Sequence, residues 1–153
     1  MTIAWLFILA APAPEGPWEV VGTEAGVRLE SRPVATSGCL EFRVTTTTPL
    51  SVETLCTAIF EWGSKGTDYP DLKHRRLLAD GMDERVSYDQ IEQPIVSNRD
   101  YAMTVRRVRE GDQCRIRFRA TNEKAPPRPE GWVRIEKLWG SWTFTPTDGG
   151  TEL

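Results

Sequence analysis

The 153-residue chain is long enough for one domain with a hydrophobic core and too short for two. It is 39% hydrophobic and 27% charged, a composition that excludes a disordered chain and a protein made of membrane spans. The net charge of −3 argues against a nucleic-acid partner, because general nucleic-acid binders carry a strong basic excess. Six tryptophans indicate a large core or a lined cavity, since each supplies a large apolar area.

The chain begins with an almost wholly apolar segment, Met1–Ala13. About 20 apolar residues are needed to cross a hydrocarbon core of about 30 Å, so this run is too short for a membrane span. It resembles the hydrophobic part of a secretory signal, although no lysine or arginine precedes it and Pro14 would follow the cut. The prediction is a signal peptide and a periplasmic or secreted protein. The alternative is a buried apolar N-terminal segment in a cytoplasmic protein.

Beyond residue 17 the sequence follows a two-residue alternation, which predicts β-strands. Val27 and Leu29 alternate with charged residues, and so do Leu40, Phe42 and Val44. Residues 33–38 read as the turn between them, so these two segments are expected to form a hairpin.

Residues 51–62 predict a helix. Ser51 is a suitable N-cap, and Glu53 lies in the first turn, where an acidic residue is favourable. The apolar residues at helical spacing are Val52, Leu55, Ile59 and Trp62.

Further strands are predicted over residues 73–79, 84–91, 101–109, 113–121, 132–138 and 141–146. The fold class is therefore α+β, dominated by an antiparallel meander. Since successive strand residues point to opposite sides, we expect Phe118 and Trp142 to face the inside of the sheet. Arg117 and Thr143 are then expected to face water.

The three cysteines, Cys39, Cys56 and Cys114, are far apart in the chain and contain no CxxC pair. Neither a zinc site nor a disulfide framework can be derived from this spacing. Each is expected on the apolar side of its element, where a thiol behaves as a small hydrophobe. The alternative is a single transient disulfide.

Three stretches, taken together, resemble the START (StAR-related lipid transfer) family. They are Trp18–Arg32, the motif Gln93-Pro94-Ile95-Val96-Ser97-Asn98-Arg99-Asp100-Tyr101, and Gly131–Pro146 with its Gly140-Ser141-Trp142 step. The resemblance extends over residues 18–153. It implies a helix-grip (START/Bet v 1-like) fold, in which a curved antiparallel sheet grips a long C-terminal helix and encloses one lipid-like molecule.

The chain departs from the family pattern at its end. It stops at residues 149–153, where the family begins its last strand, so that strand and the C-terminal helix are expected to be absent. An apolar sheet face has to be buried against something. We therefore expect the apolar face to be partly uncovered, at Phe42, Ile116, Ile135 and Trp142.

No enzyme motif is present, and the single histidine, His74, lies among basic residues and has no second histidine for a metal site. The domain is therefore expected to be non-catalytic and to need no cofactor or metal. For the polar cluster Asn98-Arg99-Asp100 two roles stay open. In the first, Arg99 or Asp100 anchors the head group of a ligand. In the second, Asn98 makes a turn, and Arg99 and Asp100 form an ion pair where the following strand begins.

Six arginines, at positions 106, 107, 109, 115, 117 and 119, are expected on the wet face of two adjacent strands. Transient contact with anionic lipid head groups is the alternative.

The resemblance implies that the apolar face binds a lipid or another hydrophobic small molecule. The candidate ligand-binding residues are Phe42, Tyr88, Arg99, Tyr101, Met103, Ile116, Phe118, Ile135, Trp142 and Phe144. Two other functions stay open. One is a polyketide aromatase/cyclase on the same fold, which would require several polar groups in the pocket. The other is a domain whose exposed sheet face binds a protein.

Overall fold

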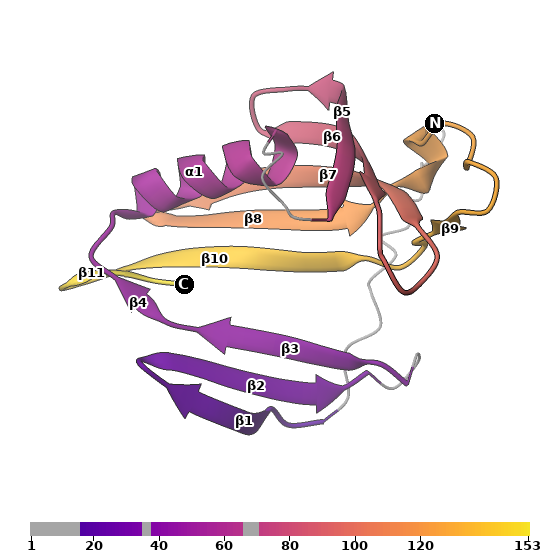
Figure 1. Cartoon of the computed structure of the whole chain (residues 1–153). Coiled ribbons are helices and arrows are strands. Elements are labelled where there is room, and N and C mark those ends of the chain that lie inside the picture. The colour runs from indigo at the N-terminus through magenta and orange to yellow at the C-terminus, as the bar shows by residue number, and fades with distance from the viewer. Residues whose placement is uncertain (1–15, 35–37, 66–70) are drawn as a thin grey trace, which may run out of the picture. The chain divides into compact units, whose positions relative to one another are not determined.

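The structure is a computed structural model that describes residues 16–34, 38–65 and 71–153 (Figure 1). The predicted signal segment, Met1–Ala13, lies outside the described residues. The chain divides into two compact units, one extending to Thr47 and the other beginning at Thr48. Each unit is described by itself below.

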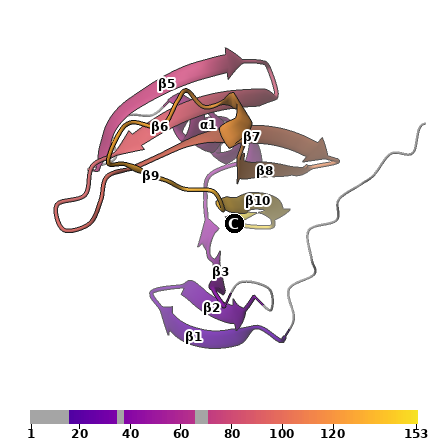
Figure 2. The ribbon, with the colours of Figure 1, turned by 90° about the vertical axis from the view of Figure 1, so that its right-hand side faces the viewer.

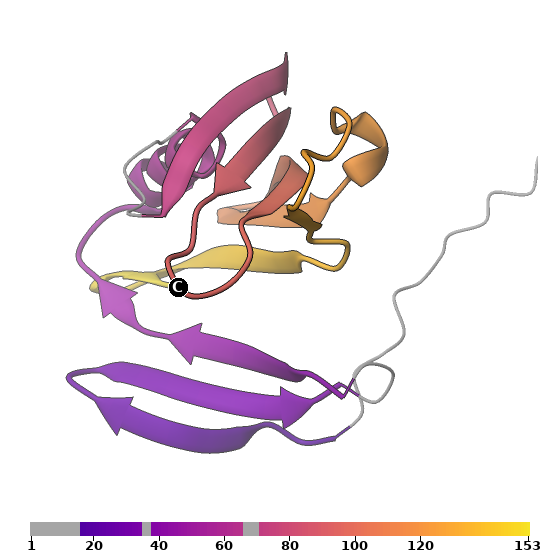
Figure 3. The same ribbon diagram turned by 45° about the vertical axis from the view of Figure 1, so that its right-hand side comes forward.

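The first unit is a three-stranded antiparallel sheet of β1 (Glu19–Glu24), β2 (Val27–Pro33) and β3 (Leu40–Thr45), which lie side by side in Figure 3. The predicted hairpin of β2 and β3 is confirmed, with Leu29 opposite Val44. β1 and β2 join through Ala25 and Gly26, which have φ values of 49° and 81°. Positive φ at both central residues is the geometry of a type I′ turn, which matches the twist of the paired strands.

A charged cluster holds this small sheet together. Glu30 is 3% exposed and accepts hydrogen bonds from Arg43 (2.7 Å) and Arg28 (2.9 Å). These guanidinium groups, Arg43 first, hold the pKa of Glu30 below its usual value. The Trp18 ring packs between the guanidinium groups of Arg43 and Arg32, at 4.4 Å and 4.2 Å from the ring centre.

The second unit is built on a sheet in the order β4-β11-β10-β8-β7-β6-β5. The strands are β4 (Thr47–Thr48, at the boundary), β5 (Leu72–Asp80), β6 (Glu84–Ile91), β7 (Arg99–Glu110), β8 (Gln113–Ala120), β10 (Trp139–Thr147) and β11 (Gly150–Glu152). β5 to β8 form an antiparallel meander, as predicted, and β10 adds to it beside β8. In the described residues the only α-helix is α1 (Val52–Lys65).

Helix α1 begins where the sequence predicts it. The Ser51 Oγ accepts a hydrogen bond from the backbone N–H of Thr54 at 3.2 Å, which satisfies one of the unpaired donors of the first turn. The helix packs against β7, β8 and β10, and its apolar side includes two fully buried residues, Cys56 and Phe60. These two positions extend the predicted apolar stripe.

The core lies between α1 and the sheet. It contains Cys56, Phe60, Met103, Val105, Cys114, Ile116 and Phe144. Ile116 is only 1% exposed because α1 covers it, so the expectation that it is partly uncovered is wrong.

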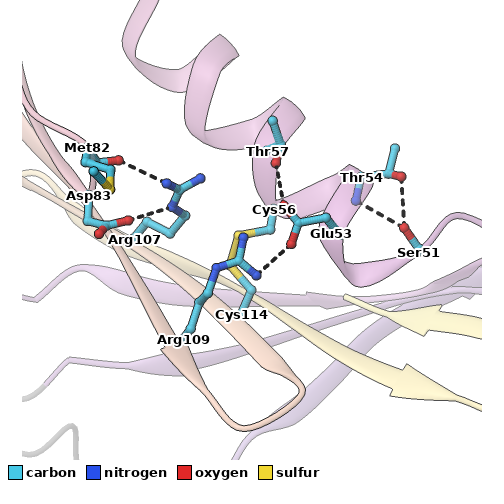
Figure 4. The surroundings of a disulfide bond; sticks show 10 residues. All are labelled: Ser51, Glu53, Thr54, Cys56, Thr57, Met82, Asp83, Arg107, Arg109 and Cys114. Atoms are coloured by element: carbon cyan, nitrogen blue, oxygen red, sulfur yellow. Dashed lines mark hydrogen bonds and ion pairs between the residues drawn. A yellow bond between two sulfur atoms is a disulfide. The ribbon is translucent and has the colours of Figure 1, made fainter.

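The prediction of three unlinked cysteines is also wrong. Cys56 of α1 and Cys114 of β8 form a disulfide, with their Cα atoms 6.1 Å apart (Figure 4). Spacing could not reveal this pair, because 58 residues separate the two positions and only the packing of α1 brings them together. The third cysteine, Cys39, is exposed rather than on an apolar face.

Residues 132–138 do not form the predicted strand. Only β9 (Val133–Arg134) pairs, and it runs parallel to β7. The backbone N–H groups of Val133 and Ile135 donate to the carbonyls of Asn98 and Asp100, each at 2.9 Å. The chain from the short 3₁₀ helix η1 (Asn122–Lys124) to β9 therefore lies beside β7 (Figure 2).

The segment expected to lack a strand, residues 149–153, contains the short strand β11, which pairs with β10. Gly150 allows this, because a Cβ there would lie 2.1 Å from the carbonyl oxygen of Thr48. No helix among residues 16–34, 38–65 and 71–153 is long and apolar enough to cross a membrane.

Candidate functional site

A pocket of about 500 Å³ opens in the second unit, between α1 and one face of the sheet. We call this side of the sheet the pocket face and the other side the outer face. The pocket is lined by Ile59, Trp62, Asp71, Leu72, Arg75, Ile91, Gln93, Tyr101, Met103, Val105, Ile116, Phe118, Leu138 and Trp142. Its volume lies within the range of about 300–1,000 Å³ that is usual for small-molecule sites, and most of its wall is apolar.

The strands supply the floor through their alternation. Tyr101, Met103 and Val105 project from β7 to the pocket face, and the register places Val105 opposite Phe118 of β8. Phe118 in turn lies opposite Gly140 of β10, where a Cβ would come within 2.4 Å of its ring. The absence of a side chain at Gly140 thus makes room for the Phe118 ring.

Helix α1 forms one wall, with Ile59 and Trp62 directed to the pocket. The Cys56–Cys114 disulfide fixes the helix three residues before Ile59. In Figure 4, Arg109 of β7 also reaches the first turn of α1, where its Nη1 lies 2.7 Å from an oxygen of Glu53. This contact, with a smaller contribution from Thr57, lowers the pKa of Glu53.

Charged groups support the same helix from the sheet. The guanidinium groups of Arg85 and Arg107 stack on the Phe60 ring, 4.4 Å and 4.7 Å from its centre. Arg85 also contacts Glu61 of α1 (2.8 Å) and Asp80 of β5 (2.6 Å). The α1 wall is therefore held by a covalent bond, ion pairs and ring contacts.

One part of the pocket is polar. Arg75 of β5 donates two hydrogen bonds to Asp89 of β6, at 2.7 Å and 2.5 Å. Both side chains are almost fully buried, at 5% and 0% exposed. A buried ion pair is costly unless its geometry is good, and the bidentate arrangement supplies that geometry. Gln93 and Asp71 line the pocket as well, with a hydrogen bond of 3.4 Å between them.

Comparison with solved structures identifies the fold. No protein-family model and no curated protein matches the sequence. The crystal structure of a STAR-related lipid transfer protein from Xanthomonas axonopodis matches with a TM-score of 0.76 and 23% identity, over 88% of this chain and 77% of that one. The chain has the START-like fold.

Two human structures agree with the START-like assignment. STARD10 matches with a TM-score of 0.69 and 19% identity, and StAR-related lipid transfer protein 5 with 0.65 and 15%. Each match covers 88% of this chain, but only 57% and 68% of the human chains. At these identities the likeness establishes the fold.

Half of the predicted ligand-binding residues line the pocket of this START-like domain. They are Tyr101, Met103, Ile116, Phe118 and Trp142. Phe118 and Trp142 face the pocket, and Arg117 and Thr143 lie on the outer face, as expected. Trp142 is nevertheless 40% exposed, and Thr143 is half-buried. Binding by the five pocket residues stays a prediction.

The other five residues lie elsewhere. Phe42 belongs to β3 of the first unit. Phe144 is fully buried in the core, and the half-buried Ile135 follows β9. Arg99 donates to the carbonyl of Ser97 at 3.2 Å and is not part of the pocket wall.

Tyr88 is on the outer face, because β6 places Ser87 and Asp89 on the pocket face. Its hydroxyl donates to Asp100 at 2.9 Å, and Asp100 also accepts from Arg134 at 3.1 Å and 2.5 Å. Burial, together with the hydrogen bond to Asp100, raises the pKa of Tyr88.

The expected pairing of Arg99 with Asp100 is therefore wrong. Successive strand residues point to opposite faces, so Asp100 pairs with Arg134 instead. The structure shows no turn at Asn98 itself: the bends lie at residues 94–96, and the Oδ1 of Asn98 accepts a hydrogen bond from the backbone N–H of Gln93 at 3.3 Å, which closes this loop.

Sequence reasoning missed the pair Arg75 and Asp89. Arg75 lies in the basic run Lys73–Arg76, which reads as a solvated strand, and Asp89 is one carboxylate among many. The two face each other only through the register of β5 with β6. Among the described residues, no group of three His, Cys, Asp or Glu side chains could hold a metal ion.

Proposed function

We propose that this domain binds one hydrophobic molecule of lipid type in the pocket between α1 and the sheet. The observation that carries the proposal is a largely apolar pocket of about 500 Å³ on a START-like fold. Ligand sites of this kind are mostly apolar, with a few polar groups that orient the ligand. Two of the similar solved structures are named as lipid transfer proteins, which supports the same class of ligand.

The ligand is proposed to carry a small polar group at one end. Arg75, Asp71 and Gln93 are the polar groups on the pocket wall, and the remaining lining is apolar apart from the Tyr101 hydroxyl and the Trp indoles. A polar head placed beside Arg75 would keep hydrogen bonds that it loses on leaving water. A purely hydrocarbon ligand would gain no hydrogen bond from these groups and is expected to bind less tightly.

Binding rather than catalysis is proposed, because the wall has few polar groups that could act on a bound molecule. The compartment is proposed to be oxidising, in the periplasm or outside the cell. Two features support this: the apolar segment Met1–Ala13 and the Cys56–Cys114 disulfide, since structural disulfides persist in oxidising compartments. Transfer of the ligand between membranes is the proposed use of the site.

The test is displacement of a fluorescent fatty-acid probe, combined with native mass spectrometry of protein purified from its source. Ile59→Trp narrows the pocket from the α1 wall, and Ala58→Trp adds the same side chain at an exposed position of the same helix. We expect Ile59→Trp to weaken probe binding at least about tenfold, a change of about 1.4 kcal/mol. Ala58→Trp is expected to bind as the unchanged protein does. Equal binding by the two variants would place the ligand elsewhere.

A further inference from the structure

Strand β8 carries three arginines at alternate positions, Arg115, Arg117 and Arg119, on the outer face of the sheet. Alternate residues lie about 7 Å apart along a strand, because each residue rises about 3.3 Å. Arg106 of β7 lies directly across from Arg117. We call these four residues the basic stripe. It lies on the side of the sheet away from the pocket, which Ile116 and Phe118 face.

The stripe concentrates positive charge on a chain whose net charge is −3. Each β8 arginine has one residue directly across from it on β7 and one on β10. These are Val108 and Thr143 for Arg115, Arg106 and Ser141 for Arg117, and Thr104 and Trp139 for Arg119. None of these is acidic. Within the described part of the chain, Arg106 forms an ion pair with Glu84 at the edge of the stripe, at 2.8 Å. Like charges directly opposite one another destabilise a sheet, so an anionic partner would relieve Arg106 and Arg117.

Trp139 lies at one end of the stripe, directly across from Arg119. It is 57% exposed, and Arg117 and Arg119 beside it are exposed too. A tryptophan with basic neighbours is typical of membrane–water interfaces, where the ring lies at the level of the lipid head groups.

We propose that the basic stripe and Trp139 dock the domain on a bilayer surface that contains anionic lipids. At a spacing of about 7 Å, one small anion reaches only one or two of these guanidinium groups, whereas a layer of head groups meets all four. The exposed indole adds an apolar contact that a free anion would not use. This inference rests on the proposed function in one respect, because a domain that loads a lipid has to meet a membrane. Since the stripe lies on the face away from the pocket, it would hold the domain at the bilayer and would not itself deliver the ligand.

The experiment is co-sedimentation of the full chain with vesicles of phosphatidylcholine alone, or with one third phosphatidylglycerol, at low and at physiological salt. We expect binding to the anionic vesicles, weakened by salt. Each basic residue at such a surface changes affinity about fivefold, so Arg115→Gln/Arg117→Gln/Arg119→Gln should lose about a hundredfold. Trp139→Ser should also weaken binding. Arg76→Gln is the control, because Arg76 is exposed on β5, away from the stripe.

Three results would overturn the docking surface: no binding to anionic vesicles, equal binding to phosphatidylcholine alone, or a triple variant that binds as Arg76→Gln does. Preference for an acidic polypeptide over the vesicles would also overturn it, because the partner would then be a protein. The fatty-acid probe is measured in the same variants. A triple variant that still binds the probe but no longer binds the anionic vesicles supports the docking surface. If the unchanged chain does not bind the probe, the proposed ligand pocket is contradicted, but the docking surface is not.

Discussion

The Cys56–Cys114 disulfide is expected to contribute a large part of the stability of the second unit. It closes a loop of 58 residues, from α1 to β8. The loop-closure entropy for a loop of this length is about −14 cal/mol/K, which is about 4 kcal/mol at 25 °C. Since the free energy of unfolding of a domain is usually about 5–15 kcal/mol, losing this link is expected to leave the unit marginally stable.

The assay is urea unfolding of the oxidised protein and of the same protein with a phosphine reductant. With a slope of about 2 kcal/mol per molar urea, the midpoint should fall by about 2 M on reduction. Cys56→Ala/Cys114→Ala should unfold at or below the reduced midpoint, because it also removes two buried side chains. Cys39→Ala is the matched control, since Cys39 is exposed and outside this disulfide.

A midpoint that moves by less than about 0.5 M on reduction would refute the reasoning, provided that peptide mapping finds Cys56 linked to Cys114 in the oxidised sample. Peptide mapping that finds Cys39 in the link would refute it equally. The pocket should respond as well, because the disulfide lies three residues before Ile59. Reduced protein that is still folded is therefore expected to release a bound probe faster than oxidised protein.

Three further changes test the sheet. Gly140→Ala should lower the free energy of unfolding by about 1–3 kcal/mol, measured in urea, because the new Cβ overlaps the Phe118 ring; an unchanged midpoint would contradict this contact. Phe118→Ala should cost up to about 3 kcal/mol and Arg117→Ala less than about 0.5 kcal/mol, and the reverse ranking would mean that the register of β8 is wrong. The raised pKa of Tyr88 predicts that the free energy of unfolding is highest below about pH 10 and falls above it, because the tyrosine ionises in the unfolded chain first. Tyr88→Phe, which also loses the hydrogen bond to Asp100, should flatten this fall in thermal melts at about pH 9–11.

The sequence by itself determined the elements whose two faces meet different surroundings. β8 has buried or half-buried residues on the pocket face and arginines outside, so its alternation is clear in the sequence. Alternation also predicts the β2–β3 hairpin, although its Leu40, Phe42 and Val44 are exposed. Helix α1 is marked by its apolar spacing and by Ser51 at its first turn. In each case a local pattern contains the information, because the residues that define the element are neighbours in the chain.

Only the tertiary structure decided which face is which on β6. Most of this strand is buried on both sides, so the contrast that alternation relies on is lost. Its polar residues Ser87 and Asp89 face the pocket side, whereas Tyr88 lies on the outer face with Asp100. Sequence reasoning assumed that apolar side chains point inward, and therefore assigned Tyr88 to the pocket.

The contacts that build the pocket join residues that are distant in the chain. Cys56 meets Cys114 because α1 packs on β8, and Arg75 meets Asp89 because β5 pairs with β6 in one register. A shift of one residue in that register would direct Asp89 to the other face. Sequence patterns specify an element and its two faces. The pairing of elements depends on the packing of the whole unit, which is why the pocket became visible only in the folded chain.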